Sequence, residues 1–296
     1  MKKQLLLFTI MLIPLVASAD DIKVKNADGV TIYYNYTNDG TELAVTFRGG
    51  SFDKYPNEYT GNVVIPEEVT YMDKTIRVTS IGESAFRSCR GLTSVTIPSS
   101  ITTIGDWAFR GCTGLTSLTI SEGVISIGDG AFTDCTGLTS VSIPSSVTSI
   151  GQIAFRDCTS LSSVTINSNS IVSKDYNVDE SNIQAIFGEQ VKNYIIGDGV
   201  NSIGKYAFYN CSGLTSVTIF EGVTSIGLAA FSRCTGLTSV NIPSSVTSIG
   251  NSAFLGCTDL TVHVADLAAW CRISFSGYPF IILNIIFILM EKKSKI

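Results

Sequence analysis

Cysteine and histidine are the residues with which this chain could do metal or nucleophilic chemistry. It has eight cysteines and a single histidine, His263. One histidine excludes zinc sites built on paired histidines, and any Cys–His or Ser–His–Asp catalysis would depend on that residue. The sequence has no C-x-x-C pair, no P-loop and no G-x-S-x-G motif. We expect no catalytic residue, metal site or cofactor, and we interpret His263 as an exposed side chain.

Seven of the eight cysteines share one spacing pattern. They are Cys89, Cys112, Cys135, Cys158, Cys211, Cys234 and Cys257. On stacked coils, identical side-chain directions would give poor geometry for disulfides, and cysteine is a small residue that buries readily. We predict a structural column of buried free thiols, with disulfides between neighbouring coils or a zinc site as the alternatives.

The elements that position these cysteines repeat every 23 residues. The pattern of a unit is I-G-x-x-A-F-x-x-C-x-x-L-x-x-V-x-I. Its first part, I-G-x-x-A-F-x-x-C-x-x-L, occurs seven times, and the closing V-x-I varies in two of the seven units. Leu92, Val95 and Ile97, separated by polar residues, predict a short strand with one buried side. Ala85–Phe86 has the spacing of one helical turn. Each unit therefore predicts one coil of a solenoid whose strands stack in parallel, because an isolated coil cannot bury enough apolar surface to fold.

The repeat resembles the BspA-like, Treponema-type leucine-rich-repeat family, from about residue 60 to 275. The resemblance implies an α/β solenoid: a leucine-rich-repeat array of 23-residue repeats with a parallel β-sheet, to which we add an N-terminal β-hairpin cap. It also implies a secreted or cell-surface protein that binds host matrix or other cells. These properties follow from the resemblance, whereas the spacing alone indicates only a solenoid.

The chain divides into five segments by composition and repeat phase. We assign a signal peptide to 1–19, an N-terminal β cap to 20–62, the solenoid to 63–264 with an insert at 167–193, a C-terminal capping segment to 265–277, and an anomalous hydrophobic tail to 278–296. The signal peptide is indicated by Lys2 and Lys3, an apolar run and an A-x-A cleavage signature before Asp20. The insert predicts a bulged repeat boundary with a short helix near Ser181–Phe187.

The tail has three interpretations. A membrane anchor could span 273–290, followed by a cluster of lysines. Alternatively, the reading frame has slipped, since the codons of Leu289–Ile296 can be read one frame away as a repeat-like segment. The third possibility is a β-strand that forms part of a native cap.

The outward positions of the strands form the candidate partner-binding face. They are Ser94, Thr96, Ser117, Thr119, Ser140, Ser142, Ser163, Thr165, Ser216, Thr218, Ser239, Asn241 and His263. Small hydroxyls on a broad face could bond a partner, although serine and threonine also simply suit exposed strands. The predicted helical side carries exposed Arg87, Arg90, Trp107, Arg110, Arg156 and Arg233 among aspartates, which we interpret as a mixed solvated surface.

Composition excludes several functional classes. The formal net charge of −5 lacks the basic excess of a nucleic-acid binder, and 45% hydrophobic residues exclude generic disorder. A polysaccharide-degrading solenoid would need clustered acids on the outward strand positions, which carry hydroxyls instead. We predict a non-enzymatic protein whose partner is a protein or glycoprotein. The alternative is a passive spacer or a fragment of a longer array, and membrane contact depends on the tail being an anchor.

Overall fold

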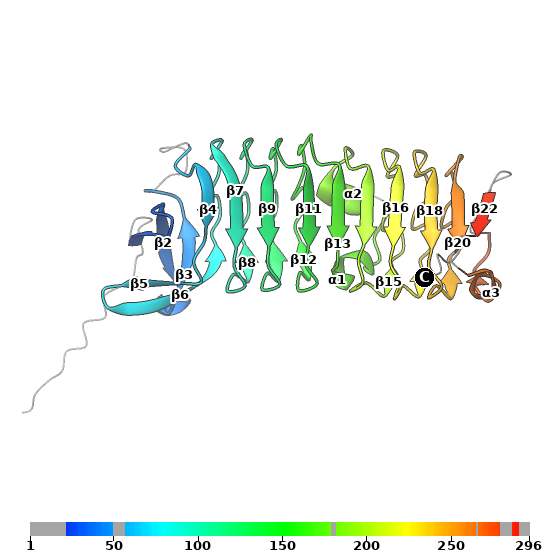
Figure 1. Ribbon diagram of the computed structural model, residues 1–296, viewed down its shortest axis with the longest axis horizontal. Helices are drawn as coiled ribbons and strands as arrows, with labels where there is room; N and C mark the ends of the chain where they lie inside the picture. Colours follow the sequence, from blue (N-terminus) through cyan, green and yellow to red (C-terminus); the bar gives the residue numbers. More distant parts are fainter. Residues whose placement is uncertain (1–21, 50–56, 179–181, 265, 279–285, 290–296) are drawn as a thin grey trace, which may run out of the picture.

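The structure is a computed structural model that describes residues 22–49, 57–178, 182–264, 266–278 and 286–289. The predicted signal peptide lies outside these ranges. Figure 1 shows a solenoid whose strands lie side by side along the long axis of the molecule. The predicted array of 23-residue coils with a parallel sheet is confirmed.

One strand from each coil forms the first ladder. These strands are β4 (Gly61–Val64), β7 (Leu92–Ile97), β9 (Ser117–Ile120), β11 (Ser140–Ile143), β13 (Ser163–Ile166), β14 (Asn193–Ile196), β16 (Ser216–Ile219), β18 (Ser239–Ile242) and β20 (Thr261–Val264). Successive coils pair in parallel, for example Val141 with Val164, but the ladder is broken between β9 and β11. Valine and isoleucine point inward and are buried, as in Val164 and Ile166 of β13. The alternation therefore sets which face of each strand meets the core.

A second ladder of very short strands runs along the other side of the coils. Its members are β6 (Lys74–Ile81), β8 (Thr103–Ile104), β10 (Ser126–Ile127), β12 (Ser149–Ile150), β15 (Ser202–Ile203), β17 (Ser225–Ile226), β19 (Ser248–Ile249) and β21 (Ser274–Phe275). Glycine follows the isoleucine because the preceding coil passes directly beneath it. A Cβ on Gly128 would lie 2.6 Å from the backbone nitrogen of Asp106. The I-G pair of the repeat is thus a packing requirement between coils.

The predicted helical turn at Ala85–Phe86 is instead a run of tight turns. Ala85 N–H donates to the Gly82 carbonyl within the coil, whereas Phe86 N–H donates to the Ala108 carbonyl of the next coil at 2.7 Å. Every second amide therefore bonds across coils, which prevents the i to i−4 bonding of an α-helix. Ser84 and Ser88 have positive φ, and the equivalent residues of the other regular coils do as well. The solenoid is consequently built from strands and turns, and the α-helices of the described residues lie in one enlarged coil and at the C-terminal end.

The core is a continuous column of aromatic rings enclosed by aliphatic side chains. Phe86, Phe109, Phe132 and Phe155 are fully buried, and their ring centroids lie 4.8–5.0 Å apart with nearly parallel planes. A second stretch of the column runs through Phe208, Phe231 and Phe254. Because each ring contacts rings of the adjacent coils, neighbouring coils bury surface that a single coil would leave exposed.

The predicted N-terminal hairpin is present. It comprises β2 (Thr31–Thr37), the 3-10 turn η1 (Asn38–Gly40) and β3 (Glu42–Thr46), preceded by β1 (Ile22–Lys25). β3 pairs in parallel with β6, so the hairpin extends the second ladder; β5 (Glu68–Tyr71) forms a hairpin with β6. The buried Tyr59 packs its ring 4.5 Å from Phe86 and donates its hydroxyl to the Thr46 carbonyl at 2.8 Å. Tyr59 therefore covers the N-terminal end of the phenylalanine column.

The insert forms an additional, enlarged coil. β14 pairs in register between β13 and β16, and Phe187 continues the ring column 5.2 Å from Phe155. The predicted short helix is α2 (Ile183–Phe187), with Asn182 as its N-cap. α1 (Asn169–Val172) occupies the place of a second-ladder strand, so β12 and β15 do not pair. Residues 179–181 of the predicted insert lie outside the described ranges.

At the C-terminal end, the phase of the repeat slips by one residue. Thr261 pairs with Ser239, Val262 and Val264 are buried, and His263 is half-buried on the outward side. α3 (Leu267–Trp270) follows, capped by the Asp266 carboxylate, and β22 (Ile286–Leu289) pairs in parallel with β20. Much of the predicted anchor at 273–290 lies outside the described residues. Within the described ranges, no helix has the length and apolar character needed to span a bilayer.

Candidate binding surfaces

The outward side chains of the first ladder form a polar face on β7, β9, β11, β13, β16, β18 and β20. All thirteen predicted positions are exposed or half-exposed. Ser94 donates to the Asn62 carboxamide at 2.9 Å and Ser216 to that of Asn193 at 2.6 Å. Thr93 of β7 donates to the same Asn62 carboxamide oxygen at 2.9 Å. Among the described residues, the other serine and threonine hydroxyls at the predicted outward positions donate to no protein acceptor. The face therefore offers uncharged hydrogen-bonding groups on a rigid frame. We call it the hydroxyl face.

The enlarged coil interrupts the hydroxyl face. β14 contributes Asn193 and Ile195 at the outward positions where other strands carry hydroxyls, and both side chains are half-buried. On the neighbouring part of the face, the side-chain oxygen of Asn241 is buried without a hydrogen-bond partner among the described residues. The sequence pattern did not predict these local differences, since it treated all coils as equivalent.

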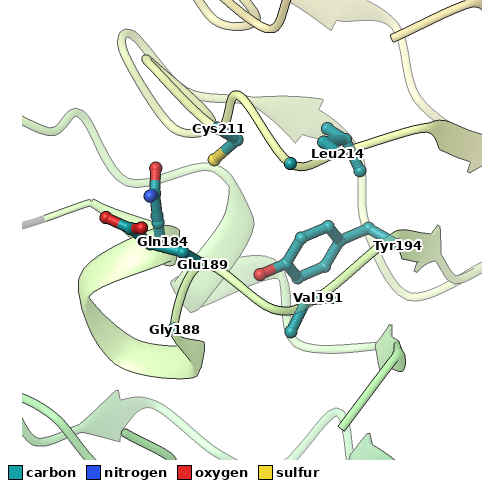
Figure 2. A pocket seen from close by; sticks show the side chains of 8 residues that line it. Gln184, Gly188, Glu189, Val191, Tyr194, Cys211 and Leu214 are labelled. Atoms are coloured by element: carbon teal, nitrogen blue, oxygen red, sulfur yellow. The ribbon is translucent and has the colours of Figure 1, made fainter. Parts of the chain in front are cut away.

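A shallow hollow lies beside the enlarged coil. Gln184, Glu189, Val191, Tyr194 and Cys211 contribute to its lining, and its volume is about 170 Å³ including space open to solvent. Figure 2 shows the Tyr194 phenol and the Cys211 thiol pointing toward this space next to α2. Burial raises the pKa of Tyr194, and its hydroxyl has no partner among the described residues. The hollow is smaller than the cavities that normally hold organic ligands.

The cysteine column lies inside the solenoid. All seven of its cysteines are buried free thiols, and Cys271 is an exposed free thiol. Cys112, Cys135 and Cys158 each donate to the carbonyl of a phenylalanine of the preceding coil at 3.0–3.2 Å. Cys234 and Cys257 make the same contact. Because these thiols donate hydrogen bonds to backbone carbonyls of the preceding coil, the column contributes to the packing between coils.

The turn side of the solenoid differs on the two sides of the enlarged coil. On its N-terminal part, Arg110 Nε lies 3.6 Å from an Asp134 carboxylate oxygen, and Arg156 makes the same contact with Asp157. The Arg110 guanidinium also lies 5.0 Å from the centre of the Trp107 ring. The Trp107 ring fills the space that a Cβ on Gly130 would occupy. Arg110, Arg156 and Trp107 are thus engaged with neighbouring side chains here.

At the enlarged coil and beyond it, tyrosines and cations gather on the same side. Lys174 lies 5.4 Å from the Tyr176 ring, Lys205 lies 5.1 Å from Tyr206, and Arg233 lies 5.5 Å from Tyr209. The Tyr206 and Tyr209 rings meet edge to face with centroids 5.5 Å apart. We call this cluster the basic tyrosine patch. Of its members, only Arg233 is among the exposed residues named from the sequence. Lys205 and Tyr206 depart from the residues of the other coils at the same positions, and this departure could have indicated the patch.

Chemistry that requires acids or metal ligands finds no support in the described ranges. No group of three histidine, cysteine, aspartate or glutamate side chains in these ranges is arranged to hold a metal ion. The exposed Asp175 carboxylate accepts a hydrogen bond from the Lys205 amide at 2.9 Å.

The profile of the BspA type leucine-rich-repeat region matches residues 79–190 and 187–265, in six copies. Among curated proteins, no significant relative of the sequence is found. Of solved structures, a T. pallidum leucine-rich-repeat protein is 25% identical, with 77% of this chain and 87% of that chain covered and a TM-score of 0.45. A leucine-rich-repeat protein from Bacteroides capillosus is 29% identical, with 49% and 97% covered and a TM-score of 0.40. Since the matched profile covers more than half of its residues, the chain belongs to the BspA-type leucine-rich-repeat family.

Proposed function

We propose that this chain is an exported, non-enzymatic protein that binds other macromolecules, and that its work is adhesion to host matrix proteins or to other cells. Membership of the BspA-type family is consistent with protein–protein interaction. The partner would be a protein or glycoprotein, held by many weak polar contacts rather than by a deep pocket. A rigid array loses little conformational entropy on binding, which favours such contacts.

The observation that carries this proposal is the hydroxyl face. Its serines and threonines stand on strands held in register by backbone pairing, and most of their hydroxyls have no protein acceptor among the described residues. A partner can therefore form hydrogen bonds there without displacing internal ones. Deep burial of a ligand is not required, since a protein interface of ordinary size uses an extended surface.

The experiment is a binding assay of the mature chain against a panel of purified extracellular-matrix proteins. We expect saturable binding to at least one of them, and a S142K/T218K variant should lower that affinity at least tenfold. Both residues are exposed outward positions of the first ladder, so the lysines should leave the fold intact. The matched control is S149K/T224K, which places two lysines on exposed positions of the other side of the coils.

The rival function is a passive spacer, and the same assay separates the two. A spacer shows no saturable binding to any matrix protein, and its surface variants all behave alike. Equal losses in S142K/T218K and S149K/T224K would also argue against the hydroxyl face as the binding surface. Export is tested separately by sequencing the N-terminus of the secreted protein, which we expect to begin at Asp20.

A further inference from the structure

The basic tyrosine patch differs from the rest of the turn side in its charge. Position by position, Lys205 stands where other coils carry Glu83, Asp106, Asp129, Gln152, Leu228 and Asn251. Arg233 stands where others carry small or acidic residues such as Asp134 and Asp157. A cluster of cations thus follows a region of alternating charges, in a chain whose formal net charge is −5.

The cations of the patch have no ion-pair partner in the part of the chain that the structure describes. Arg110 and Arg156, on the earlier coils, each lie within 4 Å of an aspartate. Across the described ranges, Lys174, Lys205 and Arg233 form no ion pair. The nearby Asp175 carboxylate is engaged by the Lys205 backbone amide. Asp179 and Glu180 of the insert lie outside the described residues. Because both are acidic, their influence on the patch is tested with a D179N/E180Q variant.

The rings hold these cations in place and leave them accessible. Lys205 and Arg233 are positioned over Tyr206 and Tyr209, and Arg233 is exposed. The patch spans adjacent coils, since Tyr206 N–H donates to the Leu228 carbonyl and Tyr176 N–H to the Lys205 carbonyl. A cation that is already oriented by a ring loses less entropy when it pairs with an anion. Tyrosine and arginine are also the residue types that dominate binding energy at protein interfaces.

We propose that the basic tyrosine patch is a second binding surface, and that its partner is an acidic polypeptide segment. This inference rests on the proposed binding function and assigns a partner class to a different face. A polypeptide fits better than a sugar, because cations already lie over the two ring faces on which a sugar would stack. Carboxylates can pair with Lys205 and Arg233 while the tyrosine hydroxyls donate to them.

The test is binding of a labelled peptide containing six consecutive glutamates, measured by fluorescence anisotropy at low and at physiological ionic strength. We expect saturable binding that weakens as salt rises, and no binding of a hexaglutamine peptide. The variants use residues that other coils already carry at the same positions, so the fold should be retained. K205Q copies Gln152, R233N copies Asn210, and Y209T copies Thr133.

K205Q/R233N should lower the affinity for the glutamate peptide about tenfold or more, and Y209T should lower it less. The matched control is R156Q, which removes an exposed arginine of the same side that pairs with an aspartate, and it should bind as the unmodified chain does. Affinity that is unchanged in K205Q/R233N, or lost equally in R156Q, would overturn the proposal. Tighter binding of a sulfated oligosaccharide than of the peptide would overturn it as well.

The neutralised form D179N/E180Q should bind the peptide at least as tightly as the unmodified chain. Binding that appears only in this form would show that the chain's own insert occupies the patch, and the proposal would fail. The S142K/T218K variant should bind the glutamate peptide normally. Failure of the hydroxyl face to bind matrix proteins can therefore be distinguished from failure of the patch to bind acidic segments.

Discussion

At the scale of single residues, the repeated cysteine contributes a small, satisfied side chain to the core. Cys135 donates to the Phe109 carbonyl at 3.2 Å and is completely buried. Serine would fill a similar volume but would bury a more polar group, and alanine would leave the carbonyl without this donor. The thiol thus combines apolar packing with a weak hydrogen bond between coils. These two properties account for a cysteine at this position without a role in metal binding.

We predict that thiol reactivity separates Cys271 from the seven column cysteines. Burial raises the pKa of Cys89 to about 12 and raises the pKa of Cys135 and Cys234 as well, so almost no reactive thiolate forms at neutral pH. Alkylation of the native protein without reductant should modify Cys271, which is exposed, and mass spectrometry should find all eight thiols modified after denaturation. Missing thiols in the denatured sample would indicate disulfides, and released zinc would indicate a metal site.

Two glutamates act as bridges between coils. The Glu122 carboxylate accepts hydrogen bonds from Ser145 and Ser146 of the next coil, and Glu221 accepts equivalent bonds from Ser244 and Ser245. Partial desolvation raises the pKa of each carboxyl, but these hydrogen bonds outweigh it. The net pKa of Glu122 and of Glu221 is therefore lower than normal. The ionised form is the one that holds the serine turn.

These bridges predict a specific dependence of stability on pH. A carboxyl whose pKa is lower in the folded state stabilises the fold fully above its unfolded pKa, and this contribution is lost as pH falls through the folded value. E122Q/E221Q should therefore be less stable than the unmodified chain at pH 7 and similar to it at pH 3. Urea unfolding at both pH values measures this. E83Q is the control, since Glu83 forms no side-chain hydrogen bond among the described residues, and an equal pH response in all three proteins would refute the prediction.

At the scale of elements, the coil rather than the strand is the structural unit. The enlarged coil replaces a second-ladder strand with α1, yet its strand β14 keeps the register of its neighbours, with Ile166 beside Ile196. Val172 accepts the Gly204 amide in the way that Ile203 accepts the Gly227 amide. The core-facing groups are therefore preserved although the backbone between them changes. The enlarged coil therefore spans 30 residues where a regular coil spans 23, without a change in the register of the first ladder.

We predict that residues 167–196 can be deleted without loss of the fold. The deletion joins Ile166 to Gly197 and restores the 23-residue spacing between the I-G pairs at Ile150 and Ile203. β13 should then pair with β16 and β12 with β15, which would make the second ladder continuous. Small-angle scattering should show a particle shorter by one coil, about 5 Å, with cooperative unfolding retained. An unfolded or aggregated product would show that the enlarged coil supplies packing that a regular coil cannot replace.

The sequence predicted what depends on periodic burial and missed what depends on pairing between coils. Leu92, Val95 and Ile97 indicated the first ladder because inward and outward residues alternate there. Apart from β6, the second ladder has strands of two residues, which are too short to show alternation. At Ala85–Phe86 the spacing indicated a helix, but alternate amides bond to the next coil instead. No residue-type preference predicts the positive φ of Ile153, since a β-branched side chain is unfavourable in that conformation.

The two candidate surfaces differ in the same way in how far the sequence predicts them. The hydroxyl face follows directly from the alternation along each strand, so its residues could be named from the sequence. The basic tyrosine patch arises where side chains of different coils meet, as Tyr209 and Arg233 do. The sequence places Arg233 on the turn side, but it does not indicate that the Tyr209 ring lies beneath the guanidinium. Such contacts depend on the turn conformation and on the direction of each side chain.

At the scale of the whole molecule, the array is close to one-dimensional. Each ring of the phenylalanine column contacts rings of adjacent coils. Energetic coupling between distant coils must therefore pass through the coils that lie between them. The column changes character at the enlarged coil, where Tyr194 meets Phe187 and Phe208 edge to face rather than stacked. In such a molecule, energetic coupling between two positions should depend on how many coils separate them.

Double-mutant cycles on the phenylalanine column test this. Each of F109A, F132A and F231A should destabilise the fold by about 3–5 kcal/mol, because each removes a fully buried ring. Phe109 and Phe132 stack at 5.0 Å, so once one ring is gone the other has lost a contact, and F109A/F132A should deviate from the sum of its single effects by about 1 kcal/mol. F109A/F231A, whose rings lie on opposite sides of the enlarged coil, should add within about 0.5 kcal/mol. Chemical denaturation measures both cycles, and similar coupling in the two pairs would mean that the solenoid unfolds as one globular unit instead of through nearest-neighbour contacts.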